Sequence, residues 1–61
     1  MRDINRIPDV LMYFRTLWEQ YPDWRFGQLI NNMQRKLGND LFFIEDDEMI
    51  KIIKQLTEKG F

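Results

Sequence analysis

Four consecutive carboxylates form the most conspicuous group of reactive side chains in this 61-residue sequence: Glu45, Asp46, Asp47 and Glu48. A calcium-binding loop alternates its oxygen ligands and has a glycine at its sharp turn, and this run has neither feature. Acidic residues are also favourable in the first turn of a helix, where they complement the helix dipole. The run therefore predicts the start of a helix and no metal site, with contact to a basic partner as the alternative.

A second group of side chains could read the bases of DNA. Arg and amide side chains recur at helical spacing, with a lysine beside them: Arg25, Gln28, Asn32, Arg35 and Lys36. The second helix of a helix-turn-helix motif presents such side chains to the major groove. The formal net charge of the chain is −1, however, whereas DNA-binding domains have a basic surplus. DNA binding is therefore an alternative interpretation, and the primary one has no nucleic-acid partner.

The residue types on which most catalysis depends are missing. The sequence has no His and no Cys, which excludes imidazole bases, thiolate nucleophiles, zinc sites of these ligands and disulfides. It also has no glycine-rich phosphate loop. We expect no enzymatic activity and no cofactor. Because small domains usually need a disulfide, a metal or a partner for stability, association is the means of stabilisation that remains.

Large apolar side chains are abundant enough to supply an interface. Aromatic residues make up 15% of the chain, and aromatics and Met are enriched at protein interfaces. We predict a homodimer or another protein partner on this ground. Five large residues either complete a small core or form an exposed contact patch: Met12, Tyr13, Trp24, Phe42 and Phe61.

The near-neutral net charge and the hydropathy of the chain argue against a membrane partner. The two halves of the chain nevertheless differ in charge. Residues 1–39 carry six Lys/Arg and four Asp/Glu, or +2, and residues 40–61 carry three and six, or −3. This asymmetry would suit head-to-tail or antiparallel self-association. No apolar run approaches the roughly 18 residues of a membrane span, and no apolar segment of a signal peptide follows the polar start. We expect a cytoplasmic protein.

Helical periodicity predicts three helices, over about residues 8–20, 24–37 and 46–59. In the first, Pro8 suits the opening turn and Pro22 ends the helix. In the second, Asp23 is the predicted N-cap and Gly38 the C-terminal glycine. The apolar stripes of the three helices are Ile7, Val10, Leu11, Phe14, Leu17, Trp18 and Tyr21; Phe26, Leu29, Ile30, Met33 and Leu37; and Met49, Ile52, Ile53 and Leu56.

Short connections between these helices predict an all-α, compact three-helix domain over residues 7–61. Residues 1–6 are polar and are expected to be frayed. The apolar run at 41–44 is too short for its period to be read, and is either an extended segment or a tucked loop. Gly27 costs about 1 kcal/mol relative to Ala inside a helix, so we expect close approach of the first helix or of a partner there.

Three motifs together resemble a family of very short bacteriophage and prophage proteins of Bacillus-like bacteria. They are Arg6-Ile7-Pro8-Asp9-Val10 followed by Trp18, the segment from Tyr21 to Leu29, and Phe42-Phe43-Ile44-Glu45-Asp46-Asp47-Glu48. The resemblance covers residues 6 to about 55 and implies no catalytic residue. It implies a phage context, in which many miniature proteins bind and disable host machinery such as defence or transcription components.

The sequence thus predicts a non-catalytic protein-binding module, most specifically a phage accessory protein that binds and inhibits a host protein in the bacterial cytoplasm. The predicted contact residues are Met12, Tyr13 and Trp24, with Arg25 and the acidic group Glu45, Asp46, Asp47 and Glu48 at the rim. The first alternative is the DNA-binding protein described above. The second is a structural or regulatory piece of a larger assembly, which would have the same sequence features.

Overall fold

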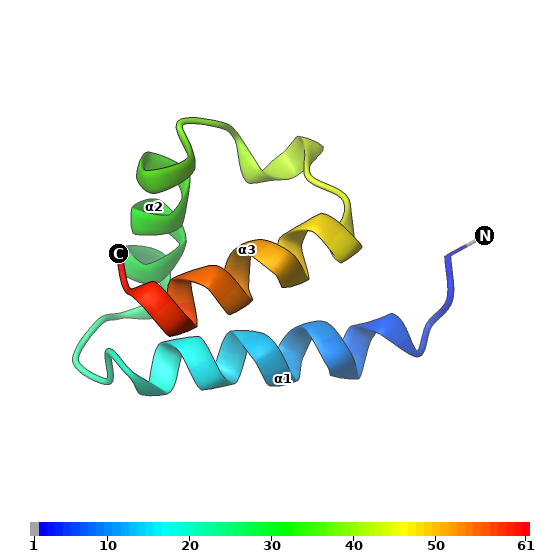
Figure 1. Cartoon of the computed structure of the whole chain (residues 1–61), viewed down its shortest axis with the longest axis horizontal. Helices are drawn as coiled ribbons and strands as arrows, with labels where there is room; N and C mark the ends of the chain where they lie inside the picture. The colour runs from blue at the N-terminus through cyan, green and yellow to red at the C-terminus, as the bar shows by residue number, and fades with distance from the viewer. Residues whose placement is uncertain (1) are drawn as a thin grey trace.

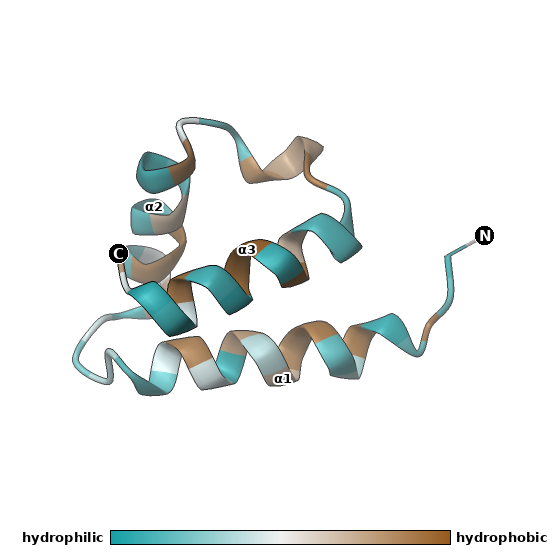
Figure 2. Cartoon of the chain, in the orientation of Figure 1, coloured by the Kyte–Doolittle hydropathy of each residue, from teal (hydrophilic) through white to brown (hydrophobic). Residues whose placement is uncertain are grey.

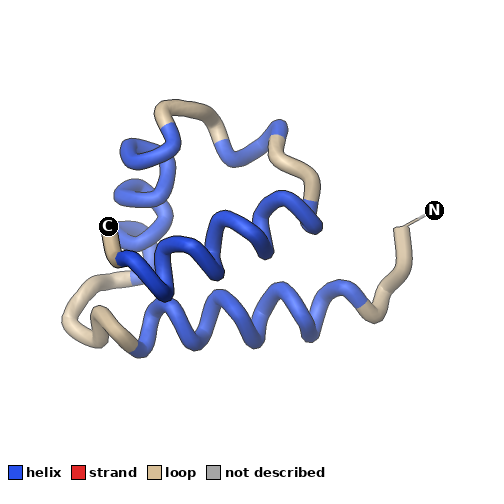
Figure 3. The backbone as a smooth tube through the Cα atoms, in the orientation of Figure 1, coloured by secondary structure: helices blue, strands red, loops and turns tan. Residues whose placement is uncertain are grey.

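The structure is a computed structural model that describes residues 2–61, and these residues form three α-helices and one 3-10 turn (Figures 1 and 3). The elements are α1 (Arg6–Glu19), α2 (Phe26–Leu37), the 3-10 turn η1 (Leu41–Phe43) and α3 (Asp46–Lys59). Residues 2–61 contain no β-strand. The predicted all-α three-helix fold is confirmed.

Helices α1 and α3 lie side by side and run in the same direction, while α2 stands across their C-terminal ends (Figure 1). An ion pair between Arg6 and Asp46 joins the starts of the two parallel helices. At their other ends, Gln20 Nε2 donates a hydrogen bond of 3.1 Å to the backbone oxygen of Thr57. The parallel pair is therefore held at both ends by polar contacts.

The core lies where the three helices meet. It consists of one residue from α1 and two from each of α2 and α3: Leu17, Leu29, Met33, Ile53 and Leu56. Half-buried aromatic and aliphatic side chains surround this cluster. Across residues 2–61, every buried side-chain nitrogen or oxygen has a hydrogen-bond partner, so the core contains no polar group without a partner.

Helix α1 begins two residues before the predicted start. Arg6 belongs to the helix and not to the predicted frayed segment, and the first residue of that segment, Met1, lies outside the described residues. Pro8 lies in the first turn, where its missing N–H leaves no intrahelical bond unmade. The helix ends with a 2.8 Å bond from Tyr21 N–H to Trp18 O, directly before Pro22.

The predicted start of α2 and the predicted N-cap are wrong. The helix begins at Phe26 with Arg25 as N-cap, and Asp23 is an exposed turn residue. Gln28 Oε1 accepts the Arg25 N–H at 2.7 Å. The turn extends beyond residue 24 because Trp18 Nε1 donates to Trp24 O at 2.9 Å, which holds that residue outside the helix.

The C-terminal glycine predicted for α2 is confirmed. Gly38 has a φ of 70°, which glycine adopts without steric cost, and its N–H donates to Gln34 O at 2.9 Å. Gly60 follows α3, whose bounds are those predicted.

The extended alternative for residues 41–44 is wrong for its first three residues. Asp40 Oδ1 accepts the Phe42 N–H at 3.0 Å, and Ile44 N–H donates to Leu41 O at 3.1 Å. These two bonds close a 3-10 turn, because a side-chain acceptor ahead of the turn holds the first free N–H group. Leu41 packs against the core and so anchors η1 to the helices.

Candidate protein-binding surfaces

The first two predicted contact residues, Met12 and Tyr13, lie on the side of α1 that meets α3. They line a groove of about 420 Å³ together with Thr16, Lys54, Thr57 and Glu58. Met12 is 55% exposed, whereas Tyr13 is half-buried and packs against the core. Lys54 Nζ lies 4.9 Å from the centre of the Tyr13 ring, within the range of a cation–π contact. Met12 is therefore free to contact a partner, whereas the Tyr13 ring already contacts Lys54 and the core.

Trp24 is a structural residue rather than part of an exposed patch. Its ring stacks on Tyr21 with 4.3 Å between ring centres, and Phe61 packs against it edge-on at 5.1 Å. Phe61 also contacts Tyr21 at 5.4 Å. These three rings close one side of the core, so Trp24 and Phe61 complete the interior. The neighbouring Arg25 is exposed.

The acidic run opens α3 as predicted, and its first two members are engaged within the chain. Glu45 is the N-cap residue and pairs with Arg2 at 3.1 Å, and Asp46 pairs with Arg6. Figure 2 shows this first turn of α3 as a hydrophilic segment. Asp47 and Glu48 are exposed and have no ion pair within residues 2–61. In that same range no group of three acidic side chains is placed to hold a metal ion.

The candidate nucleic-acid surface on α2 is divided by the structure. The Gln28 side chain is bonded to the start of the helix, and Asn32 is half-buried. Arg25, Arg35 and Lys36 are exposed, and none of them has an ion-pair partner among the residues described. Arg35 and Lys36 occupy the last turn, where cations complement the helix dipole. Of the predicted surface, three exposed cations have no partner among residues 2–61, one at the N-cap of α2 and two in its last turn.

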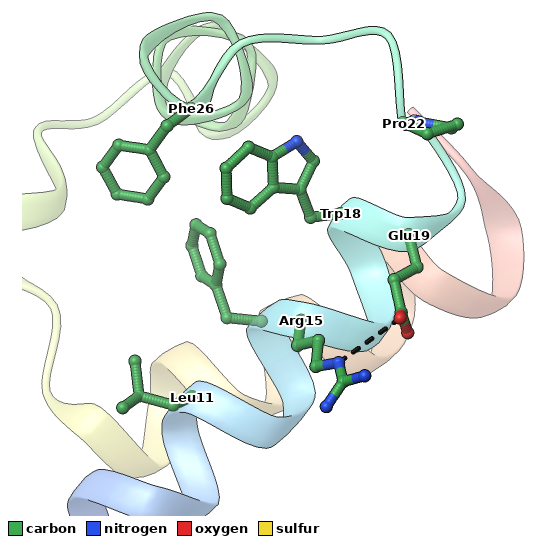
Figure 4. A pocket seen from close by; sticks show the side chains of 7 residues that line it. Leu11, Arg15, Trp18, Glu19, Pro22 and Phe26 are labelled. Atoms are coloured by element: carbon green, nitrogen blue, oxygen red, sulfur yellow. Dashed lines mark hydrogen bonds and ion pairs between the residues drawn. The ribbon is translucent and has the colours of Figure 1, made fainter.

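An apolar groove joins α1 to the start of α2 (Figure 4), and none of its lining residues was predicted as a contact. It has a volume of about 480 Å³ and is lined by Leu11, Phe14, Arg15, Trp18, Glu19, Pro22 and Phe26. The Phe26 ring lies 5.7 Å from Phe14 and 5.6 Å from Trp18, between ring centres.

The sequence placed Leu11 and Phe26 on stripes that face the core, yet they are 61% and 55% exposed. Helical periodicity identifies an apolar face but not how much of that face another helix covers. Their exposure was therefore not predictable from spacing alone.

Among residues 2–61, the most exposed large apolar side chains belong to η1. Phe42 is 82% exposed and Phe43 80% exposed, with their rings edge-to-face at 5.0 Å between centres. The turn that carries them is fixed by Asp40 on its N-terminal side, and Gln34 Nε2 of α2 donates to the same carboxylate at 3.4 Å. The sequence analysis named Phe42 among five large apolar residues, and Phe43 was not among them.

Gly27 lies in open space. A methyl group added at its Cα would meet nothing within 4 Å, so the predicted close approach of the first helix is wrong. Close approach of a partner stays a prediction.

No helix formed by residues 2–61 is both long enough and apolar enough to cross a membrane. Comparison with protein-family models, with curated proteins and with solved structures found no match to this chain.

Proposed function

We propose that this chain is a small protein-binding module whose main contact is the pair Phe42 and Phe43 on η1. The proposal rests on the exposure of these two rings, which are the most exposed large apolar side chains of the described residues. The turn beneath them is nevertheless ordered by hydrogen bonds. Exposed apolar groups of this size are typical of interaction sites.

The energetics of η1 favour binding. Burying one Phe side chain is worth about 1.5–3 kcal/mol relative to exposure, and aromatic anchors are common among the residues that dominate binding energy. The Asp40 bond to Phe42 N–H and the packing of Leu41 hold the turn before a partner arrives. A preformed contact loses less conformational entropy on binding than a flexible one.

The charges near η1 indicate a basic rim on the partner. Asp47 and Glu48 follow Phe43 by four and five positions, and neither is ion-paired within residues 2–61. Resemblance to short phage proteins supports a bacterial host protein as this partner, inhibited by occupation of its surface. The module would then act by contact and not by catalysis.

The test is affinity capture from a bacterial host lysate, followed by measurement of the dissociation constant with the captured protein. We expect Phe42→Ala and Phe43→Ala each to raise the dissociation constant roughly 10- to 30-fold, the loss typical of an anchor residue. Met12→Ala is the matched control, because Met12 is an exposed large apolar residue outside η1. Equal weakening by all three variants, or weakening by Met12→Ala alone, would contradict the assignment to η1.

The exposed cations Arg25, Arg35 and Lys36 carry the alternative of DNA binding, and salt separates the two functions. Phosphate contacts weaken steeply as ionic strength rises, whereas contact through two phenyl rings changes little. Binding to duplex DNA that falls steeply with salt and is lost in an Arg35→Ala/Lys36→Ala variant would replace the protein-binding proposal.

A further inference from the structure

The groove between α1 and the start of α2 carries an inference that is independent of η1. We propose that two copies of this chain pair through this groove, with their α1 helices antiparallel across a twofold axis. The groove is apolar along its floor, where Phe14 and Trp18 of α1 face Phe26 of α2 (Figure 4). Leu11 and Phe26, which also line the groove, are both more than half exposed.

Helix α1 has more apolar surface than this chain covers. Its apolar stripe extends from Ile7 to Trp18, yet Leu17 is its only buried residue. Helix α3 covers one side of the stripe, and the side that bears Leu11 faces the groove. An apolar helix face of this kind gains stability when a second helix packs on it.

The charged residues of the groove indicate a second copy as the occupant. Arg15 and Glu19 are the only charged residues that line it, and Arg15 Nε lies 3.3 Å from Glu19 Oε2. Both are mostly exposed, at 79% and 62% of their side chains, so each can also face a partner. A partner that presents an anion opposite Arg15 and a cation one turn further along would match both charges.

A second copy presents these charges by symmetry. In a twofold arrangement the same patch faces itself, and antiparallel α1 helices place Arg15 of each copy opposite Glu19 of the other. A parallel arrangement would place like charges together. The axis then passes at the level of residue 17, close to Trp18 and Phe26. Leu11, six residues or about 9 Å from that level, would meet the Pro22 end of the second copy.

The size of this face places the dimer among the small, reversible interfaces. A helix of 14 residues is about 21 Å long, so the buried area belongs at the low end of specific interfaces, below about 1,200 Å² in total. We therefore expect a dissociation constant on the order of 10 μM. Such a dimer forms and dissociates within an accessible range of protein concentration.

The test is sedimentation equilibrium of the full chain over a concentration series from about 1 to 500 μM. We expect the mass to rise from 7.6 kDa toward twice that value. Arg15→Glu and Glu19→Arg should each raise the dissociation constant roughly tenfold, because both cross-axis pairs become repulsive. An equimolar mixture of these two variants should recover the association, since each then presents the charge that the other lacks. Both positions are exposed, so the variants should fold.

Leu11→Ser tests the apolar part of the interface, with Met12→Ser as the matched control in the other groove of α1. We expect Leu11→Ser to abolish the rise in mass and Met12→Ser to leave it unchanged. A wild-type mass that stays at 7.6 kDa up to 500 μM would overturn the proposal. A dimer that is unaffected by Leu11→Ser and by both charge reversals would also overturn it.

The variants Phe42→Ala and Phe43→Ala should leave the mass unchanged, because η1 lies outside the groove. The dimer proposal and the binding function can therefore fail separately.

Discussion

At the scale of single residues, the glycines near the two ends of α2 differ in whether the backbone conformation requires a glycine. Gly27 lies in the first turn with no atom near the position of a Cβ, and its φ is not positive. Gly38 ends the same helix in the left-handed region, at a φ of 70°. Only the second position requires glycine for its backbone conformation.

We expect Gly27→Ala to raise the free energy of unfolding by about 0.5–1 kcal/mol, because alanine reduces the entropy of the unfolded chain and meets no atom. Gly38→Ala is the control and should lower it by about 1–2 kcal/mol, since a Cβ is strained at this φ. Urea unfolding at low protein concentration measures both. Destabilisation by Gly27→Ala would contradict the open space around this position.

The residue scale is also where sequence patterns predicted least. Leu11 and Phe26 share the helical spacing of core residues, but no other helix of the chain covers them fully. Trp24 and Phe61 lie off or beyond the stripes, yet they stack with Tyr21 over the core. Periodicity reports which residues share a face of one helix, and it contains no information on contacts between residues 37 positions apart.

At the scale of elements, the segment between α2 and α3 is organised by one carboxylate. Asp40 accepts the Phe42 N–H at 3.0 Å and is also reached by Gln34 Nε2 at 3.4 Å. Helices were easier to predict than this turn, because 12 or 14 residues show a period and three do not. The error at the start of α2 has a similar cause. The sequence offers Asp23 as the cap, and the hydrogen bond from Trp18 to Trp24 O, which periodicity does not report, accompanies a start at Phe26 instead.

We expect Asp40→Ala to speed amide hydrogen exchange at Phe42 and to lower the free energy of unfolding by about 0.5–1 kcal/mol, as for the loss of a helix N-cap. Asp40→Asn retains a side-chain oxygen in the same place and should preserve most of the protection. If the proposed function is correct, Asp40→Ala should also weaken partner binding while leaving both phenyl rings in place. Unchanged exchange at Phe42 in the alanine variant would contradict the role given to this side chain.

At the scale of the whole molecule, the charge asymmetry of the sequence is partly satisfied within one copy. The basic start of the chain and the acidic start of α3 meet because α1 and α3 are parallel, and Arg2–Glu45 and Arg6–Asp46 are the resulting pairs. The sequence showed a basic first part and an acidic second part of the chain, and we interpreted this asymmetry as suited to self-association. It could not show which helix ends are adjacent, since that depends on how α2 crosses the other two.

These two ion pairs should differ in their contribution to stability. Arg6 and Asp46 are 34% and 43% exposed, whereas Arg2 and Glu45 are 66% and 68% exposed. Water and salt screen the second pair more strongly. We expect Arg6→Gln to lower the free energy of unfolding by about 0.5–1 kcal/mol in 50 mM salt, and Arg2→Gln to lower it by less than about 0.3 kcal/mol.

Urea unfolding of both variants and the wild type in about 50 mM and 1 M salt measures this difference. Because screening weakens partly exposed pairs, the effect of Arg6→Gln should shrink at high salt. An Arg6→Gln effect that persists undiminished at 1 M salt would instead indicate that the arginine stem contributes by packing. Equal effects of the two substitutions would mean that the stability gained at the start of α3 depends only on the total positive charge near it. The paired starts of α1 and α3 would then add no specific contact to those at the other end, where Gln20 reaches Thr57.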